Sequence, residues 1–345
     1  MLMSIFKIVF VIIGTLIGAG FASGQEVYTF FFSFGIKGLI GIVISSISIG
    51  LIIYKTLKII DKYYIRNYKD LLNIIIKNKK VKDVSNIIVN IFILISFYVM
   101  IAGFGAYLNQ EFGFNEIFGS AFLAIICFGL FSTNIKGFVK INQILIPILI
   151  LVILIIGALN ISNIDFGSLK NDIIVRNNNN WFITSLLYAS YNSILLIPAL
   201  ISIRDFIGKS KNIKYISLIV IVITTVLLIT IFLFLVNVDI DFNNLQMPAV
   251  YAIYKILPNI KNVYGIIILI SIFTTAASLG ISFLNNVSKN KEYFKFFSIM
   301  ICLTSIAFSK IGFANLVNKL YPILGILGLI QILQIARFKN WKNIF

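Results

Sequence analysis

Long apolar runs separated by short polar segments dominate the chain up to residue 336. A transmembrane helix needs about 20 predominantly apolar residues, and we expect ten runs to cross a membrane. They cover residues 4–33, 36–59, 84–109, 114–132, 137–160, 181–203, 213–237, 262–288, 293–309 and 313–336. The pattern therefore predicts an all-α integral membrane protein with a single transmembrane domain over residues 1–345.

The first run contains an unusual polar and glycine-rich stretch, Gly14 to Glu26. Its glycines form two GxxxG pairs, Gly14–Gly18 and Gly20–Gly24, and one interpretation is close helix packing. The two pairs face nearly opposite ways, however, and Ser23–Glu26 matches a capping box, which marks a helix start. We therefore expect the first helix to stop near residues 14–18 and to restart near Gly24.

Such a break leaves orphan carbonyl groups on one side and orphan N–H groups on the other. Irregular backbone at membrane depth is tolerated only where it lines a cavity or is buried in protein. Glu26 has two interpretations: it closes the capping box, or it serves as a functional group that carries a coupling proton or faces a substrate ammonium group.

The sixth run is also polar in its middle. Ser190, Tyr191, Asn192 and Ser193 follow one another there, and Pro198 removes a helical hydrogen bond. These features predict a second interrupted helix restarting at Asn192 or Ser193. A continuous, kinked helix is the alternative.

The positions of the two interrupted runs predict an internal repeat. Residues 4–160 and 180–336 each hold five runs, and each half opens with an interrupted one. Because five is odd, the halves enter the membrane in opposite senses, which predicts a 5+5 inverted repeat. Paired interrupted helices at matching positions point to the binding site of a transporter.

The eighth run carries hydroxyl groups on one helical face. They belong to Ser271, Thr274, Thr275, Ser278 and Ser282. Isolated hydroxyls in a span usually bond back to their own helix, but a full stripe favours a polar path, and oxygen atoms suit a hard cation. In the third run, Tyr98, Ala102, Gly105 and Asn109 share one face, which indicates either a cavity wall or close packing.

Two outer segments join the spans in the second part of the chain. Residues 161–180 form a long link. Pro248 and Pro258 bracket a short helix, Ala249–Leu257, which is either an outer lid or a passive surface helix.

The net charge of +17 bears on orientation. With both termini inside, 22 of the 29 Lys and Arg residues lie on the inner side, as the positive-inside rule requires. The charge therefore gives no reason to expect a nucleic-acid partner, and no motif indicates a protein partner. The basic loop 55–82 either lies against anionic membrane lipids or is simply solvated.

The chain has no histidine, and its two cysteines, Cys127 and Cys302, lie within apolar runs as small core residues. No catalytic motif and no set of metal ligands is present. We therefore expect no enzymatic activity and no cofactor.

Three motifs resemble the YkvI-type membrane proteins: Gly14 to Glu26 with the following Phe30-Phe31, Tyr188–Asn192, and Phe273–Thr275. That family belongs to the amino acid–polyamine–organocation superfamily, whose fold is the LeuT-like inverted repeat. The resemblance implies ten helices with helices 1 and 6 broken, and secondary transport of a small organic solute, such as an amino acid or related amine.

The resemblance also implies site residues. A sodium ion would bind the carbonyl groups of Gly14, Ile17 and Ser271 and the hydroxyls of Thr274 and Thr275. Substrate would lie against Thr15, Gly18, Ala19, Gly20, Tyr98, Ser190, Tyr191 and Asn192. The chain departs from well-studied sodium symporters of this fold in having no arginine in the outer half of helix 1. Glu26 therefore keeps proton coupling open.

Together these features predict a cation-coupled symporter in the plasma membrane, with both termini cytoplasmic and sodium favoured over a proton as the coupling ion. A membrane receptor that binds a small molecule without transporting it is the alternative, and a channel is a third class.

Overall fold

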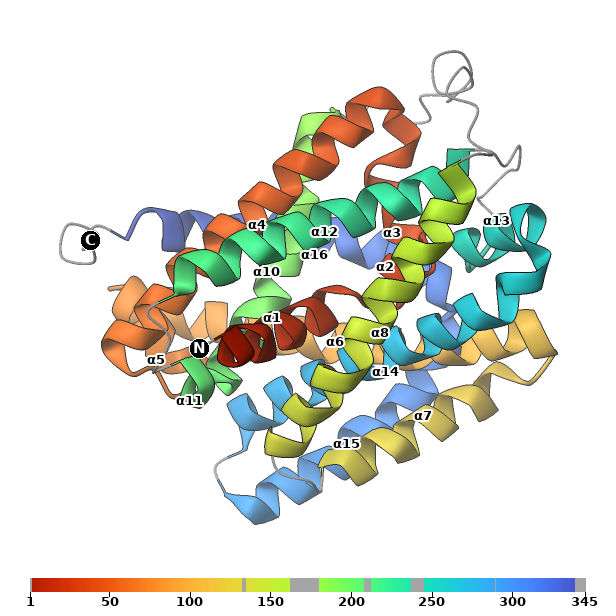
Figure 1. Ribbon diagram of the computed structural model, residues 1–345. Coiled ribbons are helices and arrows are strands. Elements are labelled where there is room, and N and C mark those ends of the chain that lie inside the picture. The colour runs from red at the N-terminus through yellow and green to blue at the C-terminus, as the bar shows by residue number, and fades with distance from the viewer. Residues whose placement is uncertain are drawn as a thin grey trace.

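The computed structural model describes residues 2–131, 135–161, 180–207, 212–236, 245–288 and 290–338. Every regular element in these ranges is a helix (Figure 1). The first half contains α1 (Leu2–Leu16), α2 (Ala19–Ala22), α3 (Gln25–Phe30), η1 (Phe32–Phe34), α4 (Ile36–Tyr63), α5 (Tyr68–Ile75), α6 (Lys79–Phe112), α7 (Glu116–Phe131) and α8 (Ile135–Ile161). The second contains α10 (Trp181–Ser202), α11 (Arg204–Ile207), α12 (Ile213–Val236), α13 (Pro248–Ile256), η3 (Pro258–Ile260), α14 (Lys261–Val287), α15 (Lys291–Phe308), η4 (Ser309–Ile311) and α16 (Phe313–Ala336).

Eight of the described helices are long and apolar enough to cross a membrane, so the protein is a multi-pass membrane protein. Two shorter apolar helices, Ile5–Leu16 and Glu116–Phe131, lie at the first and fourth expected spans. The ten-span prediction therefore depends on these two short helices. The expected short helix between the two prolines is confirmed as α13, whereas 162–179 of the expected outer link lie outside the described residues.

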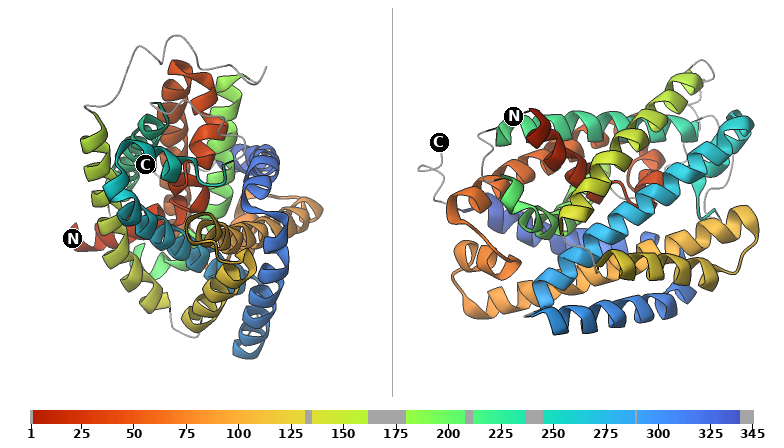
Figure 2. Two further views of the ribbon diagram at one scale, coloured as in Figure 1. Left: turned by 90° about the vertical axis from the view of Figure 1, so that its right-hand side faces the viewer. Right: turned by 60° about the horizontal axis from the view of Figure 1, so that its bottom comes forward.

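The helices α10 and α14 are largely buried, and the other long helices surround them. The helix α10 packs on α4 and α16, and α14 packs on α6 and α8. Figure 2 shows α7 and α15 side by side at the periphery, where they also contact each other. Their exposed side chains include Phe118, Phe122 and Leu303, as expected of surfaces that face lipid.

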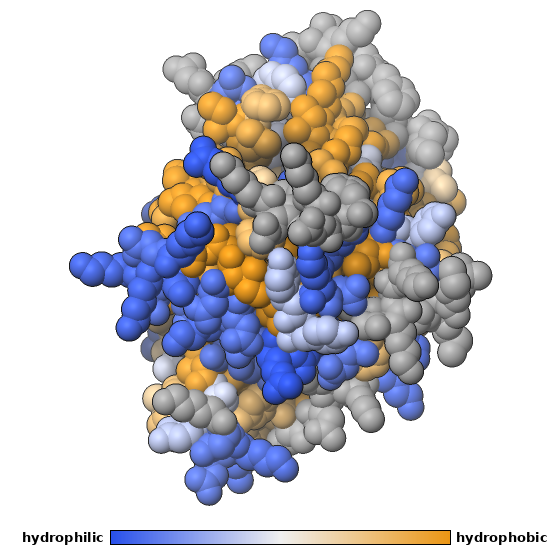
Figure 3. All heavy atoms as spheres, turned by 90° about the vertical axis from the view of Figure 1, so that its left-hand side faces the viewer, coloured by the Kyte–Doolittle hydropathy of each residue, from blue (hydrophilic) through white to orange (hydrophobic). Residues whose placement is uncertain are grey.

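One end of the bundle is polar and basic. It carries α5, α11 and the end of α16 (Figure 1), and hydrophilic residues gather across it (Figure 3). The basic loop is fastened there: Arg204 donates to the carbonyl oxygens of Tyr64 and Ile65, and the Gln331 amide donates to the Tyr68 hydroxyl at 2.6 Å. Exposed basic side chains on this loop are Lys62, Arg66, Lys69, Lys77, Lys79 and Lys80.

The predicted break at Asn192 or Ser193 is wrong, because α10 continues from Trp181 through Pro198 to Ser202. Its serine, threonine and asparagine side chains bond to their own helix. The hydroxyl of Ser193 donates to the Ala189 carbonyl, and the amide of Asn192 donates to the Tyr188 carbonyl. Such back-bonding satisfies the polar groups without ending the helix.

Candidate functional site

The predicted interruption of the first helix is confirmed. The helix α1 ends at Leu16, and the short helices α2 and α3 follow. Gly18, between α1 and α2, has extended backbone (φ −94°, ψ −169°). An α-helix leaves its last four carbonyl groups without intrahelical partners. At this break, those carbonyls lie in the buried centre of the protein, where Leu16 and Ile17 are at most 5% exposed.

The end of α1 is capped by a hydroxyl group from α14. Thr275 Oγ1 lies 2.8 Å from the Gly14 carbonyl oxygen and 2.9 Å from that of Ile17. One turn further along α14, Ser278 shares a 2.6 Å hydrogen bond with Thr15. The structure thus brings together three oxygen atoms from two elements that lie about 260 residues apart in sequence.

The other residues expected at the ion site lie on the same helix as Thr275 but bond locally. Thr274 Oγ1 donates to the Ser271 carbonyl oxygen at 3.1 Å, and Ser271 Oγ donates to the Ile268 carbonyl oxygen. Both side chains are fully buried. The Thr274 hydroxyl and the Ser271 carbonyl therefore offer two further oxygens within about one helical turn of Thr275.

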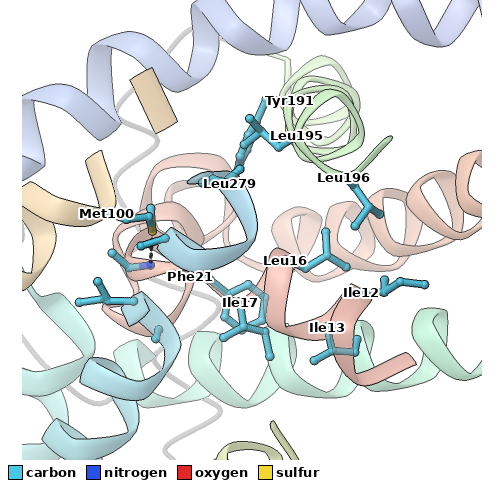
Figure 4. Close-up of a cluster of buried hydrophobic side chains, with 14 of the residues drawn as sticks. Ile12, Ile13, Leu16, Ile17, Phe21, Met100, Tyr191, Leu195, Leu196 and Leu279 are labelled. Atoms are coloured by element: carbon cyan, nitrogen blue, oxygen red, sulfur yellow. Dashed lines mark hydrogen bonds between the residues drawn. The ribbon is translucent and has the colours of Figure 1, made fainter. Parts of the chain in front are cut away.

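Met100 of α6 closes the other side of the break. Its sulfur accepts a hydrogen bond from the Ala19 backbone N–H at 3.2 Å and lies over Gly18 (Figure 4). Figure 4 also shows Leu279 of α14 and Tyr191 of α10 among the apolar side chains of this buried cluster. Sequence reasoning missed Met100, because a methionine in an apolar span carries no distinguishing signal.

Asn142 of α8 is a second residue that sequence reasoning missed. It is fully buried, and its Oδ1 lies where a Cβ atom at Gly14 would be. A buried amide inside a transmembrane run is the signal that would have found it, since polar groups at that depth are costly.

The short helix α2 is also capped from outside its own segment. The Tyr264 hydroxyl of α14 donates to the Ala22 carbonyl at 2.6 Å, and the Ala249 N–H of α13 donates to the Ser23 carbonyl at 2.7 Å. Gly24 makes the turn into α3 with φ +79°, and Ala249 packs against it. The helix α13 therefore lies directly on the interrupted segment.

The capping-box interpretation of Glu26 is wrong, because the N-cap of α3 is Gly24 and has no side-chain bond. Ser23 Oγ accepts from the Gln25 N–H, but Glu26 turns away from the helix start. Its carboxyl group instead accepts a hydrogen bond from the Tyr191 hydroxyl of α10 and packs over Gly20. Glu26 is 3% exposed, so this carboxyl group is buried between α2 and α10.

Aromatic rings surround this carboxyl group. The ring of Tyr191 contacts those of Phe30, Tyr188 and Tyr321, with centroids 5.6, 5.3 and 4.8 Å away. The Tyr188 side chain also faces Glu26. Glu26 thus contacts both Gly20 and Tyr191, two of the residues expected to lie against a substrate.

Other expected substrate residues point elsewhere. The Tyr98 hydroxyl bonds Thr304 of α15 at 2.6 Å. Ser190 bonds its own helix and lies against Gly328 of α16. Thr15 faces α14, as described above. A neutral pair that was not predicted joins α3 to α16, where Gln25 donates to Asn318 at 2.9 Å.

These features define a multi-pass helical membrane protein with an interrupted helix at its buried centre. Over 326 residues the chain is 25% identical to the uncharacterized membrane protein YkvI of Bacillus subtilis (strain 168). The aligned region covers 92% of this chain and 91% of YkvI. A second protein of that strain, the uncharacterized protein YyaD, is 32% identical over 144 residues, or 42% of this chain and 41% of its own. No family model matches the chain. The chain is therefore similar to the membrane protein YkvI over nearly its whole length.

Proposed function

We propose that the protein is a secondary transporter that moves a small organic solute, such as an amino acid or related amine, together with a cation by alternating access. The observation that carries the proposal is the contact of Thr275 with the carbonyl groups of Gly14 and Ile17 at the buried end of α1. Interrupted helices at the centre of a membrane protein place backbone carbonyls where a cation binds.

The packing of the helices supports a 5+5 inverted repeat. In the first half α1 packs on α8, and in the second α10 packs on α16. The cross-contacts correspond as well, because α1 contacts α12 whereas α10 contacts α4. The central pairs α4–α12 and α6–α14 each join equivalent helices. This exchange pattern is expected of two halves related by a pseudo-two-fold axis.

Sodium is the favoured coupling ion. It is a hard cation, and the break offers uncharged oxygens from Gly14, Ile17 and Thr275, with those of Ser271 and Thr274 adjacent. In this arrangement the carbonyls that now accept from Thr275 would bind the ion together with its hydroxyl oxygen. Glu26, the buried carboxyl group on the other side of Gly20, keeps proton coupling as the alternative.

Substrate would bind beside the same segment, near Gly18, Ala19, Gly20 and Tyr191. We place the protein in the plasma membrane with the basic end, which carries α5 and α11, toward the cytoplasm. The positive-inside rule gives this orientation. The exposed lysines of the α5 loop then face the anionic inner leaflet.

The first test is the thermal stability of the purified protein in sodium or potassium, with a panel of amino acids and amines. A ligand that binds only the folded state raises stability by RT ln(1 + [L]/Kd). We expect sodium to stabilise the wild type but not the Thr275→Val variant, in which the side chain keeps its shape and loses its hydroxyl group. The matched control is Thr225→Val on α12, whose hydroxyl bonds only the Ile221 carbonyl. If sodium stabilises both variants equally, the proposed ion site is wrong.

Transport itself is tested in sealed vesicles. A compound that stabilises the protein should accumulate when a sodium gradient is imposed and should show counterflow. Binding without uptake or counterflow would instead favour a membrane receptor. Flux without saturation or counterflow would indicate a channel.

A further inference from the structure

We propose that the solute carries a positively charged ammonium group, and that this group and a proton compete for the carboxyl group of Glu26. The inference rests on the proposed transport function, because it names the chemical class of the solute at that site. It is carried by two features of Glu26: its carboxyl group is buried without a basic partner among the described residues, and it lies beside a cluster of aromatic rings.

The first argument is the missing counter-charge. The described ion pairs, Lys261 with Glu111 and Arg204 with Asp205, lie near helix ends and do not include Glu26. Among the described residues no Lys or Arg side chain is buried, whereas Glu26 is 3% exposed. A buried carboxylate is costly unless a positive charge or a proton accompanies it. A proton or a bound cation must therefore meet this need.

The second argument is the shape and chemistry of the surroundings. Four aromatic rings, those of Phe30, Tyr188, Tyr191 and Tyr321, lie in a continuous cluster beside the carboxyl group. Aromatic faces attract ammonium groups within about 6 Å of the ring centroid. On the opposite side, Gly20 has no side chain, so the carboxyl group reaches the backbone of the interrupted segment. A carboxylate beside aromatic rings is a recognition site for organic cations.

The third argument is that Glu26 is the only carboxyl group at this site among the described residues. The titratable groups that face it are Tyr188 and Tyr191 of α10 and Tyr321 of α16. Tyrosine ionises near pH 10 in water. The short helix α2 contributes only Ala19, Gly20, Phe21 and Ala22, none of which titrates. Competition at this site is therefore between one proton and one ammonium group.

The exchange of a proton for an ammonium group conserves both protons and charge. The protonated carboxyl group releases its proton to water, and the resulting carboxylate pairs with the incoming ammonium group, which keeps its own protons. Tyr191 must give up its hydrogen bond to the carboxyl oxygen or share it with the ammonium group. Because the two ligands exclude each other, each weakens the binding of the other by the same factor.

The test measures binding of butylammonium and tetramethylammonium to the purified protein in sodium, with butyrate as the matched anion, between about pH 5.5 and pH 8.5. We expect both cations to bind, butyrate not to bind, and the apparent Kd to rise about tenfold for each pH unit below the midpoint of the carboxyl titration. Calorimetry in two buffers of different ionisation enthalpy should show up to one proton released for each cation bound.

Two variants assign the effect. Glu26→Gln should abolish cation binding, whereas Glu111→Gln, which removes the acid paired with Lys261, should leave binding and its pH dependence unchanged. If Glu26→Gln does not fold, proton release by the wild type decides the matter. Failure of both cations to bind, or binding without pH dependence, would overturn the inference. If the wild type binds the cations with proton release but shows no sodium-driven uptake, the transport proposal alone is overturned.

Discussion

The helices α1–α3 and the helix α10 open the two halves of the chain and have similar polar content, but only the first is interrupted. The difference is glycine. Residues 14–24 contain four glycines, whereas residues 181–202 contain none. Hydroxyl and amide side chains in α10 bond back to their own carbonyls, and Pro198 is accommodated within the helix. Polar side chains and a proline therefore did not suffice to break a buried helix here.

The two segments also satisfy their backbone groups differently. The interrupted segment takes its partners from elsewhere in the fold: Thr275 and Tyr264 from α14, Met100 from α6 and Ala249 from α13. The helix α10 satisfies its own backbone and is supported by α16, which approaches closely. The first segment therefore depends on its neighbours for stability more directly than the second.

The largest expected effect comes from separating α10 from α16. A Cβ atom at Gly328 would lie 2.6 Å from the Ser190 carbonyl oxygen. Because backbone must move to admit it, Gly328→Ala should lower the free energy of unfolding by about 3 kcal/mol. Thermal unfolding in detergent measures this. The control is Gly129→Ala on α7, which meets nothing within 4 Å. A loss no greater than that of the control would contradict the close approach.

The next effect removes an external partner of the interrupted segment. Tyr264→Phe deletes the donor to the Ala22 carbonyl and leaves a buried acceptor unpaired, which should cost about 2 kcal/mol. Tyr254→Phe on α13, where the side chain is 48% exposed, is the matched control and should cost little. Chemical denaturation of both variants gives the difference. Equal stability would mean that α2 does not need this donor.

A smaller effect tests the turn between α2 and α3. Gly24 has φ +79° and lies against Ala249, so Gly24→Ala combines backbone strain with a tight contact and should cost about 1.5 kcal/mol. Gly113 has φ +69° with nothing nearby, and Gly113→Ala isolates the backbone strain at about 1 kcal/mol. The unfolding midpoint should therefore be lower for Gly24→Ala than for Gly113→Ala. The reverse order would place Ala249 away from the turn.

The smallest effect is expected in α10. Ser193→Ala removes only the hydrogen bond from the side-chain hydroxyl to the Ala189 carbonyl, and that carbonyl remains within the continuous helix. Stability should change by no more than about 0.5 kcal/mol in either direction. Circular dichroism during heating provides the measurement. A loss comparable to that of Tyr264→Phe would show that the Ser193 hydroxyl has a partner beyond its own helix.

Much of the fold could be predicted because apolar runs and glycines act locally. The break after Leu16, the restart after Gly24 and the short helix α13 follow from residues within one or two turns. The hydroxyl stripe pointed to Thr275 as a cation ligand beside the interrupted helix, and the resemblance named its partners, the carbonyls of Gly14 and Ile17. Met100 could not be assigned, because its role depends on which helices pack together, whereas the amide of Asn142 marks a polar position in the span but not its partner. Glu26 fits a local capping motif, but the tertiary contact with Tyr191 outweighs that motif.

The contact between Ala249 and Ser23 has a consequence for the surface of the molecule. The helix α13 exposes Tyr254 and Lys255, while its first turn donates a main-chain hydrogen bond to the buried interrupted segment. An antibody fragment that holds α13 would thereby restrain the backbone beside Gly24 without entering the protein. Such a binder would trap one conformation from outside, and its affinity would change with whatever ligand the centre holds.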